Sequence, residues 1–317
     1  MDLKDKKILL TGAAGFLGKQ VYKKLVTRGV LETNIAAPNK ETSDLRDREV
    51  CDRLTNGIDV VIHVAGTVGG IGFNKEHPAE AFYDNAAMAL NLIDSSYRAG
   101  VKKFVGVGTV CEYPKFSPVP FKEDDLWNGY PEETNAPYGL AKKMMLVGTQ
   151  AYRQQYGFNG VHLLMINLYG PGDSFDTANS HVIAALVKKF CDAVRENKPY
   201  VEVWGTGSAS RDFLYVEDAA EGIVLAAENY DKPEPINIGS GKEIFIKDLA
   251  ETIKKLAGFT GELRWDSTKP DGQPRRGLDV TRAEKEFGFK SMTDFETGLK
   301  NTIDWYNANY GNLQSHS

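Results

Sequence analysis

Residues 7–18 read KILLTGAAGFLG, an apolar run followed by three glycines spaced three residues apart. The run predicts a short buried strand, and apolar residues at four-residue spacing over 17–25 predict a helix directly after it. Gly12 permits a tight turn, Gly15 lets the backbone approach a pyrophosphate at the helix N-terminus, and Gly18 lets the helix pack against the sheet. A glycine-rich turn between a strand and a helix indicates a dinucleotide-binding unit.

The chain goes on alternating strands with helices. Buried strands are predicted at 59–65, 103–108 and 161–166, and helices over 79–99 and 137–156. This order predicts an α/β fold in which helices cover both faces of a parallel sheet, the Rossmann-type doubly wound arrangement.

After about residue 170 the pattern becomes irregular, with loops rich in Gly, Pro, Asp and Ser. We therefore expect residues 1–170 to form an NADP-binding Rossmann domain and residues 171–317 to form mainly a smaller C-terminal α/β domain that binds substrate. Segments around 210–240 are expected to return to the first domain.

Composition excludes several classes of protein. Of 317 residues, 42% are hydrophobic and 26% charged, with a formal net charge of −5, so general nucleic-acid binding is disfavoured. No apolar run approaches the roughly 20 residues that cross a membrane. Cys51, Cys111 and Cys191 lack the spacing of a zinc site or a disulfide framework, so no metal is predicted. We expect a cytoplasmic protein.

Tyr138 and Lys142 lie four residues apart in a predicted helix, which places both side chains on one face. A nearby ammonium lowers the pKa of a phenol, so Lys142 is expected to help Tyr138 exchange a proton with a carbonyl oxygen. The strand at 103–108 leads to Thr109, whose hydroxyl can bind the same oxygen. These three residues are the arrangement of a short-chain dehydrogenase.

The resemblance to known families is specific. The G-x-x-G-x-x-G spacing resembles the extended short-chain dehydrogenases, and VGTVCEYPK at 107–115 resembles the segment around the catalytic cysteine of GDP-L-fucose synthases. Further segments that resemble this family are 135–138, 167–171, 180–183, 203–207, 211–214 and 269–275.

The resemblance implies a reaction. Enzymes of that family epimerise carbons 3 and 5 of GDP-4-keto-6-deoxy-D-mannose and then reduce the carbon 4 ketone with NADPH, which gives GDP-L-fucose. It implies that Cys111 and His181 are the acid-base groups on opposite faces of the sugar ring. From the residues alone, Cys111 could equally be a small buried hydrophobe and His181 a helix-start residue. His63 and His162 are expected to be satisfied core residues.

The cofactor is expected to be NADP(H). No acidic residue precedes Glu41 in the segment after the predicted second strand, and Lys40 can pair with a 2′-phosphate, unless it is only a solvated loop charge. By resemblance, Asp44 and Leu45 contact the adenine and Ala65 and Gly66 lie beside a ribose. The expected cofactor contacts are Gly12, Gly15, Phe16, Leu17, Gly18, Lys40, Asp44, Leu45, Ala65, Gly66, Tyr138 and Lys142.

The resemblance also implies the substrate contacts and the assembly. Lys189, Arg211 and Arg276 would bind the diphosphate of a GDP-sugar, Trp204 would lie near the nucleotide, and Asn167 would orient the substrate. Many relatives carry Arg in place of Lys189, and Arg binds phosphate with two bonds where Lys acts as a point charge. The family also implies a homodimer formed through the helices at 79–99 and 137–156.

Alternative functions stay open at this point. One is another sugar-nucleotide enzyme, such as a 4-epimerase, a 4,6-dehydratase, a GDP-mannose 3,5-epimerase, or a reductase of a related deoxyhexose or deoxyheptose. A dehydratase would carry an acidic pair after Thr109, where this chain has Val110 and Cys111 before Glu112. A different class is a non-catalytic NADP-binding regulator, which would usually lack the Tyr or the Lys.

Overall fold

A parallel sheet of six strands forms the centre of the computed structural model, which describes residues 1–176, 180–269 and 271–311. Its strand order is β2-β1-β3-β4-β5-β9, and every neighbouring pair is parallel. The strands are β1 (Ile8–Thr11), β2 (Ile35–Ala36), β3 (Val60–His63), β4 (Lys103–Thr109), β5 (Gly160–Met165) and β9 (Ile236–Ile238). The predicted doubly wound α/β fold is confirmed.

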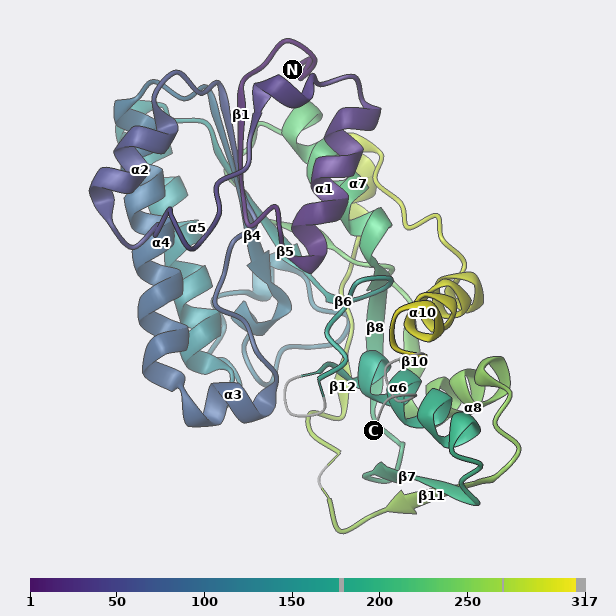
Figure 1. The fold of residues 1–317 in the computed structure, drawn as a ribbon. Helices are drawn as coiled ribbons and strands as arrows, with labels where there is room; N and C mark the ends of the chain where they lie inside the picture. The colour runs from purple at the N-terminus through teal and green to yellow at the C-terminus, as the bar shows by residue number, and fades with distance from the viewer. Residues whose placement is uncertain (177–179, 270, 312–317) are drawn as a thin grey trace.

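Helices cover both faces of this sheet (Figure 1). The helices α1 (Phe16–Thr27) and α7 (Val216–Asn229) pack together on one face. On the other face α4 (Pro78–Arg98) packs between α2 (Arg48–Thr55) and α5 (Ala136–Tyr156). The short helix α3 (Ile71–Glu76) precedes α4.

The alternating side chains of β1 build the two layers of the core. Ile8 and Leu10 join the apolar cluster on the α1 side with Val21 and Leu25, whereas Leu9 joins the cluster on the α4 side with Val61. Successive residues of a strand point to opposite faces, so an all-apolar run is required wherever both faces are covered. Each such side chain contributes roughly 1.5–3 kcal/mol through burial.

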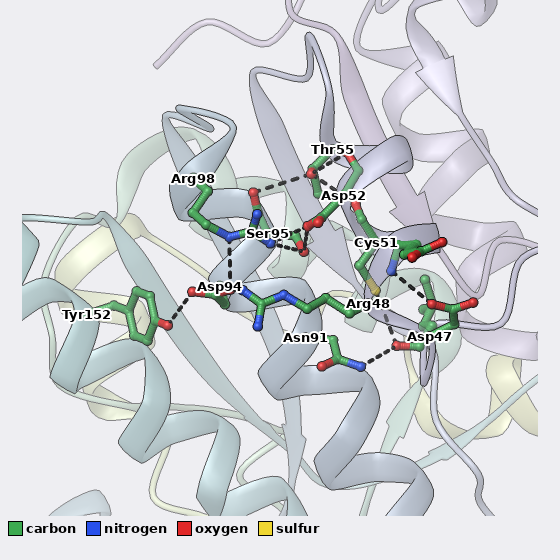
Figure 2. Close-up of polar contacts among 12 residues, drawn as sticks. Asp47, Arg48, Cys51, Asp52, Thr55, Asn91, Asp94, Ser95, Arg98 and Tyr152 are labelled. Carbon is green, nitrogen blue, oxygen red and sulfur yellow. Dashed lines mark hydrogen bonds and ion pairs between the residues drawn. The ribbon is translucent and has the colours of Figure 1, made fainter.

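A charge network ties α2 to α4 and α5 (Figure 2). Arg98 pairs with both Asp52 and Asp94, and Arg48 reaches Asp94 at 2.5 Å. The Tyr152 hydroxyl of α5 also donates to Asp94, at 2.7 Å. Because the half-buried carboxylate of Asp94 holds groups from all three helices, this network ties the helices of this layer together.

The second lobe contains a smaller mixed sheet and lies below the large sheet in Figure 1. Its central strand β8 (Ser210–Tyr215) pairs antiparallel with β10 (Glu243–Phe245) and parallel with β6 (Asn167–Tyr169) and β12 (Arg275–Arg276). The strands β7 (Tyr200–Trp204) and β11 (Glu262–Asp266) form a parallel pair. The helices of this part are α6 (Val182–Arg195), α8 (Ile246–Ala257) and α10 (Phe295–Tyr310), whereas α9 (Thr281–Phe287) packs against β9 and α7 of the first lobe.

The strands and helices predicted in the first half of the chain match the observed ones to within a few residues. The strand β9 and helix α7 lie beyond residue 171 in the chain and still belong to the large sheet and its covering layer. None of the helices in the described ranges is long and apolar enough to span a membrane.

Candidate active site

The glycine turn between β1 and α1 has no room for side chains at two of its three glycines. Gly12 has a φ of +76°, and a Cβ there would lie 2.7 Å from the Ala65 nitrogen. A Cβ on Gly18 would lie 2.0 Å from the Gly12 oxygen. Gly15 precedes α1 with φ −76°, and its added Cβ would be 3.2 Å from that same oxygen. The packing of the protein itself therefore does not require a glycine at position 15. A glycine is expected there if a ligand approaches the backbone.

The first turn of α1 is open to an anion. It contains no acidic side chain, and no side chain caps it by a hydrogen bond. The N–H groups at Phe16, Leu17 and Gly18 are therefore available to a phosphate, since the first N–H groups of a helix have no partner within it. The residues present thus fit the pyrophosphate of a dinucleotide.

Three further residues that were expected to contact the cofactor follow β2 in the chain: Lys40, Asp44 and Leu45. Lys40 is exposed in a turn after β2 and has no ion pair within the described residues. Asp44 is held by Arg46, at 2.7 Å, and Arg46 also binds Asp84. The Leu45 side chain is buried in the core, so only its backbone can meet a ligand.

Lys142 joins the ends of two strands beneath the cofactor loop. Its Nζ donates to the carbonyl oxygens of Val107, at 3.1 Å, and Ala65, at 3.5 Å. The side chain is buried, and desolvation lowers the pKa of Lys142 to about 8, against a smaller opposing effect of Glu112. At neutral pH the amine of Lys142 is mostly protonated, and its Nζ lies beside Gly66.

Tyr138 differs from the sequence-based expectation. Lys142 was expected to lower the pKa of Tyr138, but burial raises the pKa of Tyr138 well above its usual value. The negative charges at Cys111 and Glu112 add to this increase, while a hydrogen bond with the Thr109 hydroxyl opposes it. Desolvation is the largest of these effects, so the phenol of Tyr138 retains its proton at neutral pH.

Cys111 lies in the 3₁₀ helix η2 (Val110–Glu112), which begins directly after Thr109. Its N–H donates to Thr109 Oγ1 at 3.2 Å, and its Sγ lies 3.8 Å from Nη1 of Arg276. The other end of the Arg276 guanidinium donates to Gln273 Oε1 at 2.9 Å, and Gln273 Nε2 donates to the Lys115 carbonyl oxygen at 2.8 Å. The guanidinium of Arg276 is therefore held beside the sulfur of Cys111.

Arg276 makes a contact that the resemblance did not imply. The resemblance placed Arg276 at the diphosphate alone, whereas the structure also places it against Cys111. Gln273, which orients it, was missed as a functional residue. Only its position three residues before Arg276 could have suggested the contact.

His181 stands at the start of α6, where its backbone caps the helix. The ring is exposed to solvent, yet surrounding protein atoms desolvate it and lower its pKa. Asn167 on β6 donates to the Asp212 carbonyl oxygen at 3.1 Å.

The expected anion-binding cations lie in two places of the second lobe: Arg211 and Arg276 are paired across β8 and β12, whereas Lys189 lies on α6. Lys188 pairs with Asp192 at 2.9 Å, but the neighbouring Lys189 points elsewhere, and its Nζ lies 5.8 Å from the Trp204 ring centroid. Burial and the like charge of Arg276 lower the pKa of Arg211 to about 10. Neither Arg211 nor Arg276 has a carboxylate within ion-pair distance in the described residues. Two adjacent, unpaired guanidinium groups are suited to a diphosphate.

The structure also places Glu112 and the two histidines of the apolar strands. Glu112 is fully buried and contacts His162, so it cannot act on a substrate as the acid of a dehydratase would. His162 was expected to be satisfied, but its Nδ1 has no partner in the described chain. His63 is buried and its Nδ1 lies 2.8 Å from the Thr11 hydroxyl, as expected for a core residue.

The glycine turn on α1, with a tyrosine and a lysine on the helix α5 that follows β4, defines an NAD(P)-dependent oxidoreductase of the short-chain dehydrogenase type. The model of the NAD dependent epimerase/dehydratase family matches residues 8–239. GDP-L-fucose synthase 1 of Arabidopsis thaliana is 39% identical over 314 residues, which cover 98% of this chain and 96% of that protein. The chain belongs to this family of enzymes, and within it to the GDP-L-fucose synthases.

Solved structures agree with this assignment. A GDP-L-fucose synthetase from Naegleria fowleri bound to NADP is 28% identical, with a TM-score of 0.86, and the match covers 98% of this chain and 96% of that one. A GDP-6-OMe-4-keto-L-xylo-heptose reductase from C. jejuni is 27% identical, with a TM-score of 0.89, and the match covers 96% of this chain and 98% of that one.

Proposed function

We propose that this protein epimerises carbons 3 and 5 of GDP-4-keto-6-deoxy-D-mannose and reduces the carbon 4 ketone with NADPH to give GDP-L-fucose. The observation that carries the proposal is the position of Cys111, whose N–H bonds the Thr109 hydroxyl and whose sulfur lies against the cation of Arg276. A base of this kind beside a ketone-binding Thr and Tyr is suited to epimerisation next to that ketone.

The epimerase step depends on the acidity of the hydrogens on carbons 3 and 5, which flank the ketone. Removing one of them leaves an enolate, and the hydroxyl groups of Thr109 and Tyr138 stabilise its oxygen. Inversion requires one group to remove a proton and another to return a proton to the opposite face. Cys111 and His181 are assigned to these two tasks. No hydrogen bond joins the two side chains within the described residues.

The reductase step uses the same ketone. NADPH supplies a hydride to carbon 4 when it is bound. Tyr138 donates the proton to the carbonyl oxygen, for which its raised pKa is suited, because the phenol is protonated at neutral pH. Lys142 holds the cofactor ribose and carries the positive charge that favours the negative oxygen in the transition state.

The preference for NADPH is assigned to Lys40, which is exposed and unpaired within the described residues at the edge where the 2′-phosphate would lie. The NADP found with the Naegleria relative supports this choice. The first domain holds the cofactor, while Lys189, Trp204 and Arg211 of the second lobe hold the nucleotide of the substrate, with Asn167 nearby to orient the sugar.

A homodimer is part of the proposal. The helices α4 and α5 pack side by side and expose large apolar side chains to solvent on their outer surfaces. Contiguous exposed apolar surface is typical of an interface. The residues concerned are Phe82, Tyr83, Leu90, Met144 and Val147. A cytoplasmic location stays a prediction; the three cysteines are free thiols, which accords with a reducing compartment.

A second candidate is a reductase of another GDP-linked 4-keto sugar. The similarity to the C. jejuni heptose reductase supports it. The Cys111–Arg276 contact favours the fucose route, because a simple reductase needs no base next to the ketone-binding groups.

The test is a turnover assay with GDP-4-keto-6-deoxy-D-mannose and either NADPH or NADH. We expect NADPH to be oxidised and GDP-L-fucose to form, with NADH much less effective. Formation of a reduced sugar without inversion would favour the second candidate. Tight NADPH binding with no turnover on this substrate would refute the substrate assignment.

A further inference from the structure

Gln273 joins the two lobes of the protein next to Cys111. Its Oε1 accepts hydrogen bonds from Nε of Arg276, at 3.2 Å, and from Nη2, at 2.9 Å, while its Nε2 donates to the Lys115 carbonyl oxygen at 2.8 Å. An arginine can only donate and a carbonyl oxygen can only accept, so the amide meets both partners in this orientation alone. No step of the proposed reaction uses Gln273.

The Lys115 end of this bridge is fixed by the backbone of the first lobe. The N–H of Lys115 donates to the Tyr130 carbonyl oxygen at 2.9 Å, and Pro114 and Pro131 form an antiparallel bridge beside it. Gln273 is therefore anchored to a paired stretch of main chain, which is held more firmly than an exposed side chain would be.

The Arg276 end is fixed at two points. Its backbone is placed by the pairing of β12 with β8, in which Arg276 lies opposite Arg211. Its guanidinium, at the far end of a flexible side chain, is held along one edge because Nε and Nη2 share the oxygen of Gln273. Two bonds along one edge restrict the rotation of the group, and Nη1 then faces the Cys111 sulfur at 3.8 Å.

Arg276 keeps N–H groups for an anion in this orientation. A guanidinium carries five N–H groups. Gln273 accepts from two of them and the Cys111 sulfur from a third, which leaves one N–H on each terminal nitrogen. Arg276 can therefore hold the sulfur and a phosphate oxygen at the same time, and neither has to displace the other.

We propose that Gln273 is a positioning residue, which holds Arg276 so that one guanidinium contacts the Cys111 sulfur and the diphosphate of the substrate together. Binding of the nucleotide end of the substrate is then joined to the exchange of protons at carbons 3 and 5 through a single side chain. The inference rests on the proposed function for the identity of the substrate and for the role of Cys111. The orientation of Arg276 and its contact with a diphosphate depend on neither.

The test is Gln273→Met, which keeps the length of the side chain and removes both polar ends. The Nε–H of Arg276 is observed by ¹⁵N NMR, and its signal is identified by its absence in Arg276→Lys. In the wild type we expect the hydrogen bond to Gln273 to protect this N–H from exchange with water, with or without GDP. In Gln273→Met we expect the signal to be lost.

Two results of this experiment would overturn the proposal. One is a protected Nε–H signal in Gln273→Met, which would show that Gln273 does not hold the guanidinium. The other is loss of the wild-type signal when GDP is added, because the diphosphate would then compete with Gln273 for Arg276.

Binding and exchange measure the consequences. Affinity for GDP, followed by calorimetric titration, and deuterium uptake at carbons 3 and 5 of the saturating keto sugar should each fall about tenfold in Gln273→Met. NADPH affinity should stay as in the wild type, which a general loss of structure would not allow. Unchanged GDP affinity in a variant that has lost the Arg276 signal would overturn the proposal.

Gln150→Met is the matched control. Gln150 on α5 also donates from Nε2 to a backbone carbonyl oxygen, that of Pro233 at 3.1 Å, and no hydrogen bond joins it to Arg276 in the described ranges. This variant should leave the Arg276 signal, GDP affinity and deuterium uptake unchanged. Equal losses in Gln150→Met and Gln273→Met would contradict the role given to Gln273.

If Gln273→Met does not fold, Gln273→Glu decides. Its carboxylate keeps the acceptor for Arg276 but opposes the charge that the guanidinium offers to a diphosphate. We expect the protected Nε–H signal to remain and GDP affinity to fall about tenfold. A lost signal or an unchanged GDP affinity would overturn the proposal.

The measurements separate this inference from the function on which it rests. If Gln273→Met loses the Arg276 signal and GDP affinity while the wild type exchanges no hydrogen of the keto sugar, the proposed function alone is refuted. If the wild type exchanges both hydrogens and Gln273→Met keeps the signal and GDP affinity, the role of Gln273 alone is refuted.

Discussion

Arg276 holds its Nη1 3.8 Å from the Sγ of Cys111, although 165 residues separate them in the chain. The contact forms because β12 pairs with β8, while the Phe121 N–H donates to the Gly277 carbonyl oxygen at 2.8 Å and binds the two lobes together. The second lobe thus supplies the charge for a base that the first lobe presents.

Arg276→Gln should slow proton exchange at carbons 3 and 5 of the substrate by at least about tenfold, because a charge-assisted interaction worth roughly 1.5–3 kcal/mol is lost. Cys111→Ser should slow it further, by roughly 10²–10⁴-fold. Deuterium uptake from D₂O into the keto sugar, followed by mass spectrometry, measures both effects. NADPH binding should stay unchanged in each variant.

Arg275→Gln is the matched control for that series. Arg275 adjoins Arg276 in β12 but is exposed and pairs with Glu243 at 2.5 Å. Exchange that falls as much in Arg275→Gln as in Arg276→Gln would contradict the role given to the Cys111 contact.

The rate of reduction should depend on the charge of Lys142. Burial lowers the pKa of Lys142 to about 8, so the active ammonium is present below that pH and is lost as the pH rises through it. We expect kcat/KM for NADPH-dependent reduction to fall about tenfold per unit above this value. A rate that stays level to pH 9.5 would show that the charge of Lys142 is not required.

Gly15 and Gly18 should respond differently to the same substitution. Gly18→Ala places a Cβ 2.0 Å from the Gly12 oxygen, which should cost roughly 1–3 kcal/mol or more and lower Tm by several degrees. Gly15→Ala has only a 3.2 Å contact to absorb, so Tm should change little.

NADPH affinity should nevertheless fall at least about tenfold in Gly15→Ala, because the methyl group occupies the approach of the pyrophosphate. Thermal melting and fluorescence titration with NADPH measure the two effects separately. Gly15→Ala that binds NADPH as the wild type does would refute the placement of the pyrophosphate.

Lys40→Ala should weaken NADPH binding about tenfold or more and leave NADH binding unchanged, since only NADPH carries the 2′-phosphate that Lys40 is assigned to hold. Isothermal titration with both cofactors measures the ratio. Lys4→Ala, an exposed lysine near the N-terminus, should alter neither affinity. If the affinities for NADPH and NADH fall equally, Lys40 does not recognise the 2′-phosphate and acts only as a general surface charge.

Local patterns in the sequence predict much of the first lobe. The apolar run at β1 and the spacing of Leu17, Val21 and Leu25 are each set within a few residues, and the structure places them as predicted. The two-residue strand β2 is too short to show a period, although its position was expected from the cofactor argument.

The sequence does not reveal the contacts that join distant segments. The register that pairs Arg276 with Arg211 joins strands β12 and β8, which lie far apart in the chain. The contact of Arg276 with Cys111 depends in addition on how the two lobes pack. The burial of Tyr138 likewise depends on the assembled site, which is why its pKa rises where a neighbouring lysine alone predicts a fall. The Glu112–His162 pair was not predicted, and its one trace in the sequence is Gly108, where a Cβ would lie 2.2 Å from Glu112 Oε1.

The most direct test of the proposed function is one reaction in D₂O with GDP-4-keto-6-deoxy-D-mannose and NADPH, with the product sugar analysed by NMR. The account predicts GDP-L-fucose that carries deuterium at carbons 3 and 5 and the transferred hydrogen of NADPH at carbon 4. A product reduced at carbon 4 with its original hydrogens and configuration at carbons 3 and 5 would contradict it.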